Sequence, residues 1–169
     1  MNHEFFMREA LAEARKAYGL NEVPIGCVIV RDGEVIARGY NERNTNKNAL
    51  HHAEITAIDA ACGAVGDWRL DDCVLYVTIE PCPMCAGAIV QARIPVVVFG
   101  ARNAKAGCAG SILDIMREPR FNHQVEVLEG VLGDECGALM SEFFLRFRAN
   151  LASSSSSSIA PVFTNPMLA

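Results

Sequence analysis

The sequence predicts an α/β fold in which a mixed five-stranded sheet lies between layers of helices. Two β-type segments come first, joined by a tight turn, and the later β-type segments alternate with segments of helical periodicity. Those later segments are continuous apolar runs, which are typical of strands covered on both faces. The length of 169 residues suits one domain with a core of its own.

The first half of the chain predicts a helix, a hairpin and a second helix. Apolar residues at helical spacing indicate an amphipathic helix over 3–18, which Gly19 would end. "IGCVIV" (25–30) and "VIARGYN" (35–41) predict two strands joined by a turn at Asp32–Gly33. The polar stretch 42–50 predicts a loop, and the next helix is expected from about His52 to Ala61.

The second half predicts three further strands, a helix between the first two of them, and a closing helix. The strands are expected at 73–79, 95–100 and 124–130, and the helices at 85–93 and 134–148. The chain changes character at Ala152, so we expect a folded domain over 1–151 and a tail over 152–169. The serine run Ser153–Ser158 cannot bury enough apolar surface to offset its chain entropy, which predicts a flexible tail.

Composition excludes several classes of protein. No apolar run reaches the roughly 18 residues of a membrane helix, so we expect no membrane partner. The charged N-terminus lacks the apolar core of a secretory signal, which predicts a cytoplasmic protein. Seven cysteines, an odd number, argue against a disulfide framework. The net charge of −5 is unlike that of a general nucleic-acid binder, but the segment 102–120 carries four basic and two acidic residues, a local charge of +2.

Two motifs far apart in the chain carry the chemistry. Cys82 and Cys85 form a Cys-x-x-Cys at the point where an apolar strand gives way to a helix, and helix N-termini favour thiolates. Alone, this motif also suits a redox pair or half a structural zinc site. His52, with Glu54 two residues later, adds a third metal ligand and a carboxylate.

Three ligands leave one position of tetrahedral zinc open for water, whose pKa falls to about 7 when it is bound there. Glu54 is then placed to move protons between the water and a substrate. The full pattern, His-x-Glu, 26 intervening residues and Pro-Cys-x-x-Cys, is the known signature of zinc-dependent nucleobase deaminases, in which the glutamate is the general acid/base. His51 lacks the spacing to Glu54, and we expect it to be a loop residue.

Residues 3–150 resemble the bacterial tRNA-specific adenosine deaminases, which belong to the cytidine deaminase superfamily. The resemblance rests on "EVPIGCVIV", "GYN", "HHAEITAI", "LYVTIEPCPMCAGAI", "VVFGARNAKAGCAGS" and "NHQVEVLEGVL". It implies a three-layer α/β/α fold, one Zn²⁺ per subunit and a homodimer. It also implies conversion of adenosine to inosine at the wobble position of an arginine tRNA, with the anticodon stem-loop as partner.

The resemblance also implies roles for individual residues. It makes His52, Cys82 and Cys85 the zinc ligands and Glu54 the proton shuttle. The other residues that it assigns are expected to bind substrate: Asn41 on the flipped nucleoside; Val23, Pro24, Gly26 and Ala53 in the base pocket; Arg102, Asn103 and Lys105 in a loop at the anticodon; and Phe144, Arg146 and Arg148 near the RNA. From the residues alone, Asn41 equally suits a turn and the phenylalanine suits a core.

Asn103 departs from the family pattern, which has aspartate there. A neutral amide repels phosphate less than a carboxylate does. Binding through the amide would also depend less on a hydrogen bond with a ribose 2′-OH, so single-stranded DNA is a further candidate partner. Two other functions stay open on the sequence. One is deamination of a free base or nucleoside, of the cytosine or guanine type, and the other is a zinc-stabilised binding module without turnover.

Overall fold

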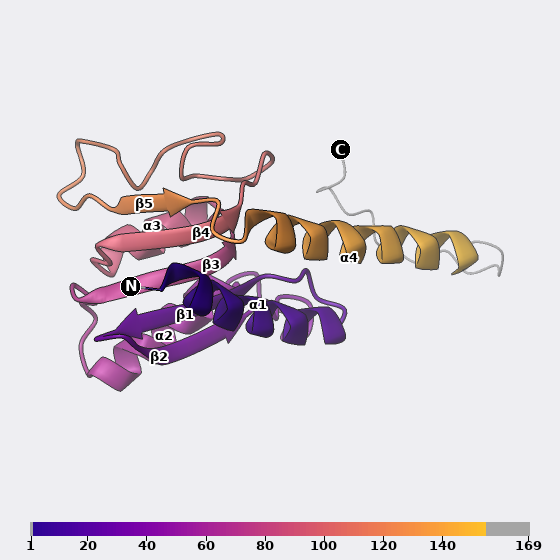
Figure 1. Ribbon diagram of the computed structural model, residues 1–169, viewed down its shortest axis with the longest axis horizontal. Coiled ribbons are helices and arrows are strands. Elements are labelled where there is room, and N and C mark those ends of the chain that lie inside the picture. The colour runs from indigo at the N-terminus through magenta and orange to yellow at the C-terminus, as the bar shows by residue number, and fades with distance from the viewer. Residues whose placement is uncertain (1, 155–169) are drawn as a thin grey trace.

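The computed structural model describes residues 2–154, and the chain there forms a mixed sheet covered by helices on both faces (Figure 1). This confirms the predicted α/β class. The elements in chain order are α1 (His3–Gly19), β1 (Gly26–Arg31), β2 (Glu34–Tyr40), α2 (Ala53–Val65), β3 (Cys73–Ile79), α3 (Pro83–Gln91), β4 (Val96–Ala101), β5 (Glu126–Glu129) and α4 (Gly133–Ser154).

The sheet has the strand order β2-β1-β3-β4-β5. β1 pairs antiparallel with both β2 and β3, whereas β3 with β4 and β4 with β5 are parallel. The hairpin turn that joins β1 to β2 has positive φ at Asp32 (52°) and Gly33 (80°), the conformation that matches the twist of a two-residue hairpin. The expected tight turn at this dipeptide is therefore confirmed.

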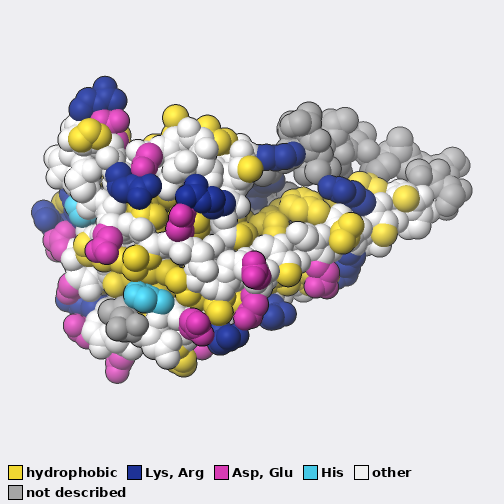
Figure 2. Space-filling model, turned by 45° about the horizontal axis from the view of Figure 1, so that its top comes forward, with side chains coloured by type: hydrophobic (Ala, Val, Ile, Leu, Met, Phe, Trp, Pro, Cys, Tyr) yellow, Lys and Arg dark blue, Asp and Glu magenta, His cyan; other side chains and the backbone are white. Residues whose placement is uncertain are grey.

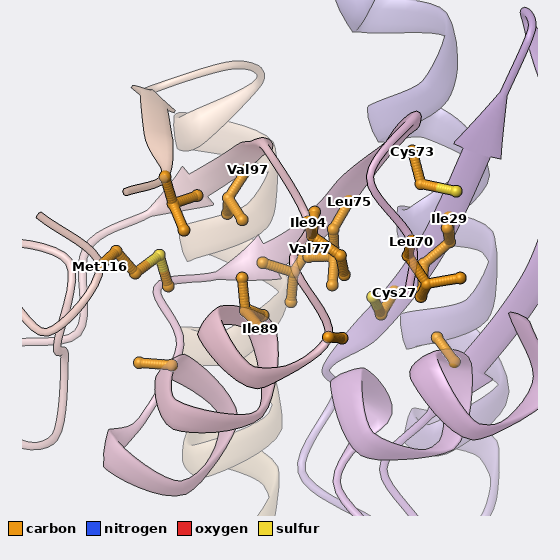
Figure 3. Close-up of a cluster of buried hydrophobic side chains, with 14 of the residues drawn as sticks. Cys27, Ile29, Leu70, Cys73, Leu75, Val77, Ile89, Ile94, Val97 and Met116 are labelled. Atoms are coloured by element: carbon orange, nitrogen blue, oxygen red, sulfur yellow. The ribbon is translucent and has the colours of Figure 1, made fainter. Parts of the chain in front are cut away.

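Each face of the sheet has its own core. On one face, α1 and the start of α4 pack on the sheet around Tyr76 and Val98. On the other face, α2 and α3 pack on the sheet, and Figure 3 shows Ile89 of α3 together with the strand residues Leu75 and Val77 in this second core. The three layers agree with the architecture that the family resemblance implies. They also place the N-termini of α2 and α3 on the same face.

All four helices differ from the expected ranges at one or both ends, and α3 covers Pro83–Gln91 instead of 85–93. α1 includes Gly19 as its last residue, Leu20 is its C-cap, and it is Asn21 that adopts positive φ (57°). α2 begins one residue after His52 and runs on to Val65. α4 continues to Ser154, beyond the residue at which the tail was expected to begin, and in Figure 1 its second half extends past the sheet as an arm. The remainder of the expected tail, 155–169, lies outside the described residues.

The surface combines charges of both signs with exposed apolar side chains. Figure 2 shows Lys and Arg beside Asp and Glu over the body of the molecule, and hydrophobic side chains along the arm that α4 forms. Leu145 and Leu151 of this helix are 65% and 39% exposed. Across residues 2–154, no helix is both long enough and apolar enough to cross a membrane.

Candidate active site and metal centre

His52, Cys82 and Cys85 converge although they come from distant parts of the chain. The Nδ1 atom of His52 lies 3.6 Å from the Sγ of Cys82 and 3.5 Å from the Sγ of Cys85. His52 is the N-cap of α2, and Cys82 is the N-cap of α3, with Pro83 in the first turn. Both cap residues have extended backbone, which turns their side chains away from the helix and toward one another.

The two thiols of this group differ in protonation. Hydrogen bonding with Cys85, followed by that with His52, lowers the pKa of Cys82 to about 4 in spite of burial. The same hydrogen bond, reinforced by burial, raises the pKa of Cys85 above its usual range. The surroundings thus favour the thiolate form of Cys82, and the thiolate is the form in which cysteine binds metals.

Glu54 is a buried carboxylate beside this group. Its side chain is 3% exposed, and its Oε2 atom has no hydrogen-bond partner within the described part of the chain. Burial raises the pKa of Glu54 to about 7, against the lowering effect of nearby backbone and of His52. Loss of solvent disfavours the charged form of a carboxyl group. A carboxyl group with a pKa near neutrality can both accept and return a proton.

The donor set fits a metal ion such as zinc. In residues 2–154, His52, Cys82 and Cys85 form a group whose ligand atoms all lie within 4.8 Å of one another. One imidazole nitrogen and two sulfurs suit zinc, and three protein ligands are the number found at catalytic rather than structural zinc sites. The unpartnered oxygen of Glu54 supplies the polar group that such a site needs next to its open position.

His51 stands apart from this group. Its ring lies 2.8 Å from the side-chain amide of Asn46, and its carbonyl accepts a hydrogen bond from the backbone N–H of Glu42 (3.0 Å). Both contacts are within the loop that precedes α2. The structure thus supports the expectation that His51 is a loop residue and that His52 is the ligand.

The residues expected to line a base pocket lie around the ends of β1 and β2. Asn41 is buried, and its side-chain amide donates to the carbonyl of Val23 (3.3 Å), which ties the end of β2 to the segment before β1. Pro24 is buried in that segment. A Cβ on Gly26 would overlap the carbonyl oxygen of Ala10, so α1 packs directly on this glycine. Ala53 is buried in the first turn of α2, directly after His52.

The basic segment after β4 is largely paired with acidic side chains. Arg102 forms an ion pair with Glu129 (2.6 Å), and Arg117 and Arg120 pair with Asp114 and Glu118. The Oδ1 atom of Asn103 accepts hydrogen bonds from the backbone N–H groups of Lys105 (3.2 Å) and Ala106 (3.1 Å). Exposed ion pairs are weak, so Arg102 can exchange Glu129 for a phosphate at little cost.

The three residues assigned on α4 lie in its second half. Phe144 is half-buried, whereas Arg146 and Arg148 are exposed. The guanidinium of Arg146 lies over the ring of Tyr18, 5.3 Å from its centroid, and donates to the side chain of Asn21 (3.4 Å). The structure therefore brings this part of α4 against the end of α1.

Glu80 is a structurally important residue that the sequence analysis missed. It follows β3 directly and is 2% exposed, and its carboxylate accepts hydrogen bonds from three residues of the 102–111 segment. Although burial opposes ionisation, these hydrogen bonds hold the pKa of Glu80 below its ordinary value. An acidic residue at the end of an apolar strand, two positions before a ligand, was the signal that could have identified it.

Comparison with known proteins places the chain among deaminases. Residues 1–148 match the family model of the MafB19-like deaminases. The chain is 53% identical over 145 residues to the tRNA-specific adenosine deaminase of Bacillus subtilis (strain 168), a match covering 86% of this chain and 90% of that protein.

Two solved structures give the same result for the fold. A tRNA:A34 deaminase, studied for A-to-I editing at the wobble position of transfer RNA, has a TM-score of 0.77 and 43% identity, and the match covers 80% of this chain and 98% of that one. Guanine deaminase from Bacillus subtilis has a TM-score of 0.59 and 34% identity, and the match covers 88% of this chain and 95% of that one.

Proposed function

The chain belongs to the MafB19-like deaminases, and on that premise we propose that it converts adenosine to inosine at the wobble position of a tRNA anticodon. The reaction adds one water at C6 of the adenine and releases one ammonia. The observation that carries the proposal is the convergence of His52, Cys82 and Cys85 beside the buried carboxylate of Glu54. The 53% identity to a tRNA-specific adenosine deaminase supports the choice of substrate.

His52, Cys82 and Cys85 would hold one Zn²⁺, which would make a water molecule nucleophilic at neutral pH. Glu54 takes one proton from the attacking water and delivers it to the ring nitrogen next to C6. It then takes the remaining proton from the hydroxyl group at C6 and delivers it to the departing amine, so that ammonia leaves and the C6 carbonyl forms. Because its Oε2 atom has no partner and it is buried, the carboxylate is free to face the reacting atoms. The surrounding apolar side chains exclude bulk water from these proton transfers.

We further propose that the assigned residues bind the anticodon loop of an arginine tRNA. Asn41 contacts the flipped nucleoside, in a pocket walled by Val23, Pro24, Gly26 and Ala53. Arg102, Asn103 and Lys105 meet the anticodon backbone, and Phe144, Arg146 and Arg148 meet the RNA further out. The exposure of Arg102, Arg146 and Arg148 supports these contacts. An anticodon loop suits such a site because its bases unstack at low cost.

Three further properties belong to the same proposal. The enzyme acts as a homodimer, which the exposed apolar side chains Ile112, Leu113 and Phe121 support. It works in the cytoplasm, which seven free cysteines favour, because disulfides are rare in reducing compartments. It also accepts single-stranded DNA as a secondary substrate, because Asn103 replaces the aspartate of relatives with a neutral amide.

Deamination of a free base is the second candidate function, since the chain is also 34% identical to a guanine deaminase. The deciding experiment incubates the protein with an arginine tRNA anticodon stem-loop and, separately, with free adenosine, guanine and cytosine. Mass analysis then detects inosine and locates it in the RNA. Inosine at the wobble position supports the proposal. Ammonia release from the free bases or nucleosides alone favours the second function, and bound zinc without turnover would indicate a binding module.

A further inference from the structure

Glu80 is the centre of a hydrogen-bond cluster that the proposed chemistry does not use. Its Oε2 accepts from the backbone N–H of Asn103 (2.9 Å), and its Oε1 accepts from those of Ala109 (2.9 Å) and Ser111 (3.0 Å). The hydroxyl of Ser111 also donates to Oε2. All four donors belong to the segment 103–111, and the carboxylate is buried beneath it.

Glu80 also adjoins the turn that carries two metal ligands. It lies two residues before Cys82, and the carbonyl of Pro81 between them accepts from the backbone N–H of Cys108 (2.9 Å). A Cβ on Gly107 would overlap the Oε2 atom of Glu80, so glycine at this position allows the loop to approach the carboxylate closely. The buried side chain of Glu80 thus connects the turn that carries Cys82 and Cys85 to both ends of the 103–111 loop.

The same loop presents the side chains that are proposed to meet RNA. Arg102 immediately precedes the segment, and Asn103 and Lys105 open it. The segment lies outside the helices and the five strands of the sheet, so it depends on hydrogen bonds such as those to Glu80 for a single conformation. A contact loop that is already ordered binds with a smaller entropic cost than one that must be ordered on binding.

We infer that Glu80 is a positioning residue. Its carboxylate fixes the 103–111 loop, and with it Arg102, relative to the turn that carries Cys82 and Cys85. RNA bound by the loop is thereby placed with its target nucleotide at the site. This inference rests on the proposed contact between Arg102, Asn103, Lys105 and the anticodon. Glu80 touches neither the reacting atoms nor the RNA in this role. Its loss should therefore weaken productive RNA binding far more than it slows the chemical step.

The test is Glu80→Gln, assayed with the anticodon stem-loop at fixed salt. Glutamine keeps the shape but offers an amide NH₂ to a cluster composed only of donors. We expect KM to rise about tenfold, the scale of losing a hydrogen bond to a charged group, while kcat changes much less. Amide hydrogen exchange at Asn103, Ala109 and Ser111 should accelerate by a similar factor, and zinc should stay at one per chain.

Glu13→Gln is the matched control, because Glu13 is an equally buried glutamate whose partners, Lys16 and Arg38, lie away from the loop. It should leave KM and the exchange of the loop amides unchanged. An equal rise in KM for Glu13→Gln would mean that general destabilisation is the cause and would overturn the inference. Should Glu80→Gln fail to fold, Ser111→Ala removes the hydroxyl donor alone and should raise KM in the same direction.

Arg102→Ala separates this inference from the proposed RNA contact. If Arg102→Ala raises KM and Glu80→Gln changes neither KM nor loop exchange, the loop contacts RNA but Glu80 does not position it. If Glu80→Gln loosens the loop and both variants keep the KM of the wild type, the loop does not bind the anticodon, and the inference fails together with the proposed contact.

Discussion

Glu54 shows how surroundings decide the chemistry of one residue. Glu80 and Glu54 are both buried glutamates, yet their pKa values shift in opposite directions. Glu80 accepts hydrogen bonds at both oxygens, which stabilises its charge, whereas Glu54 keeps one oxygen without a partner and its burial favours the protonated form. The first environment suits a structural anchor, and the second suits a group that exchanges protons.

We expect Glu54→Gln to keep its metal and to lose most of its activity. The amide preserves the shape of the side chain but cannot accept and return a proton, so turnover should fall by about 10² to 10⁴, the usual range for an acid/base group. Single-turnover assays and metal analysis of the same preparation measure the two properties. Loss of zinc in this variant would show that Glu54 is a ligand.

The adjacent histidines should behave differently when each is replaced by alanine. His52→Ala removes the imidazole that lies 3.5 and 3.6 Å from the two sulfurs, so zinc content and activity should both be lost. His51→Ala removes a loop contact to Asn46 and should retain the metal. Atomic absorption on dialysed proteins distinguishes them, and the reverse result would mean that the motif has been assigned to the wrong histidine.

Asn103→Asp tests whether residue 103 determines the preference of the protein for RNA over DNA. Because the Oδ1 atom of Asn103 accepts two backbone hydrogen bonds that a carboxylate can accept equally well, the substitution should preserve the loop and change only its charge. We expect the ratio of DNA to RNA deamination rates to fall, since the carboxylate repels phosphate and favours a ribose 2′-OH. Matched hairpins at fixed salt provide the measurement. If Asn103→Asp leaves the ratio of DNA to RNA deamination rates unchanged, Asn103 does not determine the preference between RNA and DNA.

At the scale of the elements, periodicity predicted the type of every helix and strand, but it could not fix their ends. His52 was expected inside a helix because apolar periodicity begins near it, whereas the structure uses it as an extended cap. The end of α4 was placed too early because composition changes at Ala152, although nothing in "RANLAS" stops a helix. The Asp32–Gly33 dipeptide, by contrast, located the hairpin turn correctly.

The metal set could be predicted because each of its two motifs, His-x-Glu and Cys-x-x-Cys, has a short spacing that the sequence shows directly. The position of Glu80 at the end of an apolar strand could have marked it, but its partners could not be predicted, because they are backbone N–H groups 23 to 31 residues later and leave no side-chain pattern. The pairing of Arg102 with Glu129 was hidden because the two side chains are 27 residues apart in the chain. This ion pair reduces the local charge that the sequence suggested. Contacts made by the backbone of loops therefore cannot be predicted from the spacing of residues in the sequence.

The position of α2 depends on Gly39 in the neighbouring strand. A Cβ at Gly39 would overlap the carbonyl oxygen of Ala53 and lie 2.7 Å from the backbone nitrogen of Ala57, so Gly39→Ala must push the first turn of α2 away from β2. That turn follows His52 and carries Glu54. We expect a loss of about 1–3 kcal/mol in stability and weaker zinc binding, measured by denaturation and by competition with a chelator.

Gly63→Ala is the control for this prediction, because Gly63 lies in the same helix with open space around its Cβ position. Alanine there should stabilise α2 by about 0.5–1 kcal/mol through helix propensity and should leave zinc affinity unchanged. If the two alanine variants behave alike, the contact between Gly39 and α2 does not position the site.

At the scale of the whole molecule, the apolar surface that remains exposed after folding lies partly in the connection between β4 and β5. Ile112, Leu113 and Phe121 are 54%, 55% and 47% exposed. Leu113, Ile115 and Phe121 also line a hollow of about 550 Å³. The charged residues Asp114, Glu118 and Arg120 also line this hollow. Exposed apolar side chains beside polar ones are typical of a binding face, and a second copy of the chain is the occupant that the proposed homodimer requires.

We therefore expect the protein to sediment with a mass near twice the 18.3 kDa of one chain. Leu113→Asp places a charge in the proposed interface, where it would lose its hydration on association, so this variant should shift toward monomer. Phe5→Asp alters a side chain of similar exposure (53%) on α1 and should leave the mass unchanged. Sedimentation equilibrium over a hundredfold range of concentration makes the comparison. A wild type that stays monomeric throughout would contradict the dimer, and dissociation by Phe5→Asp but not by Leu113→Asp would place the interface on α1 instead.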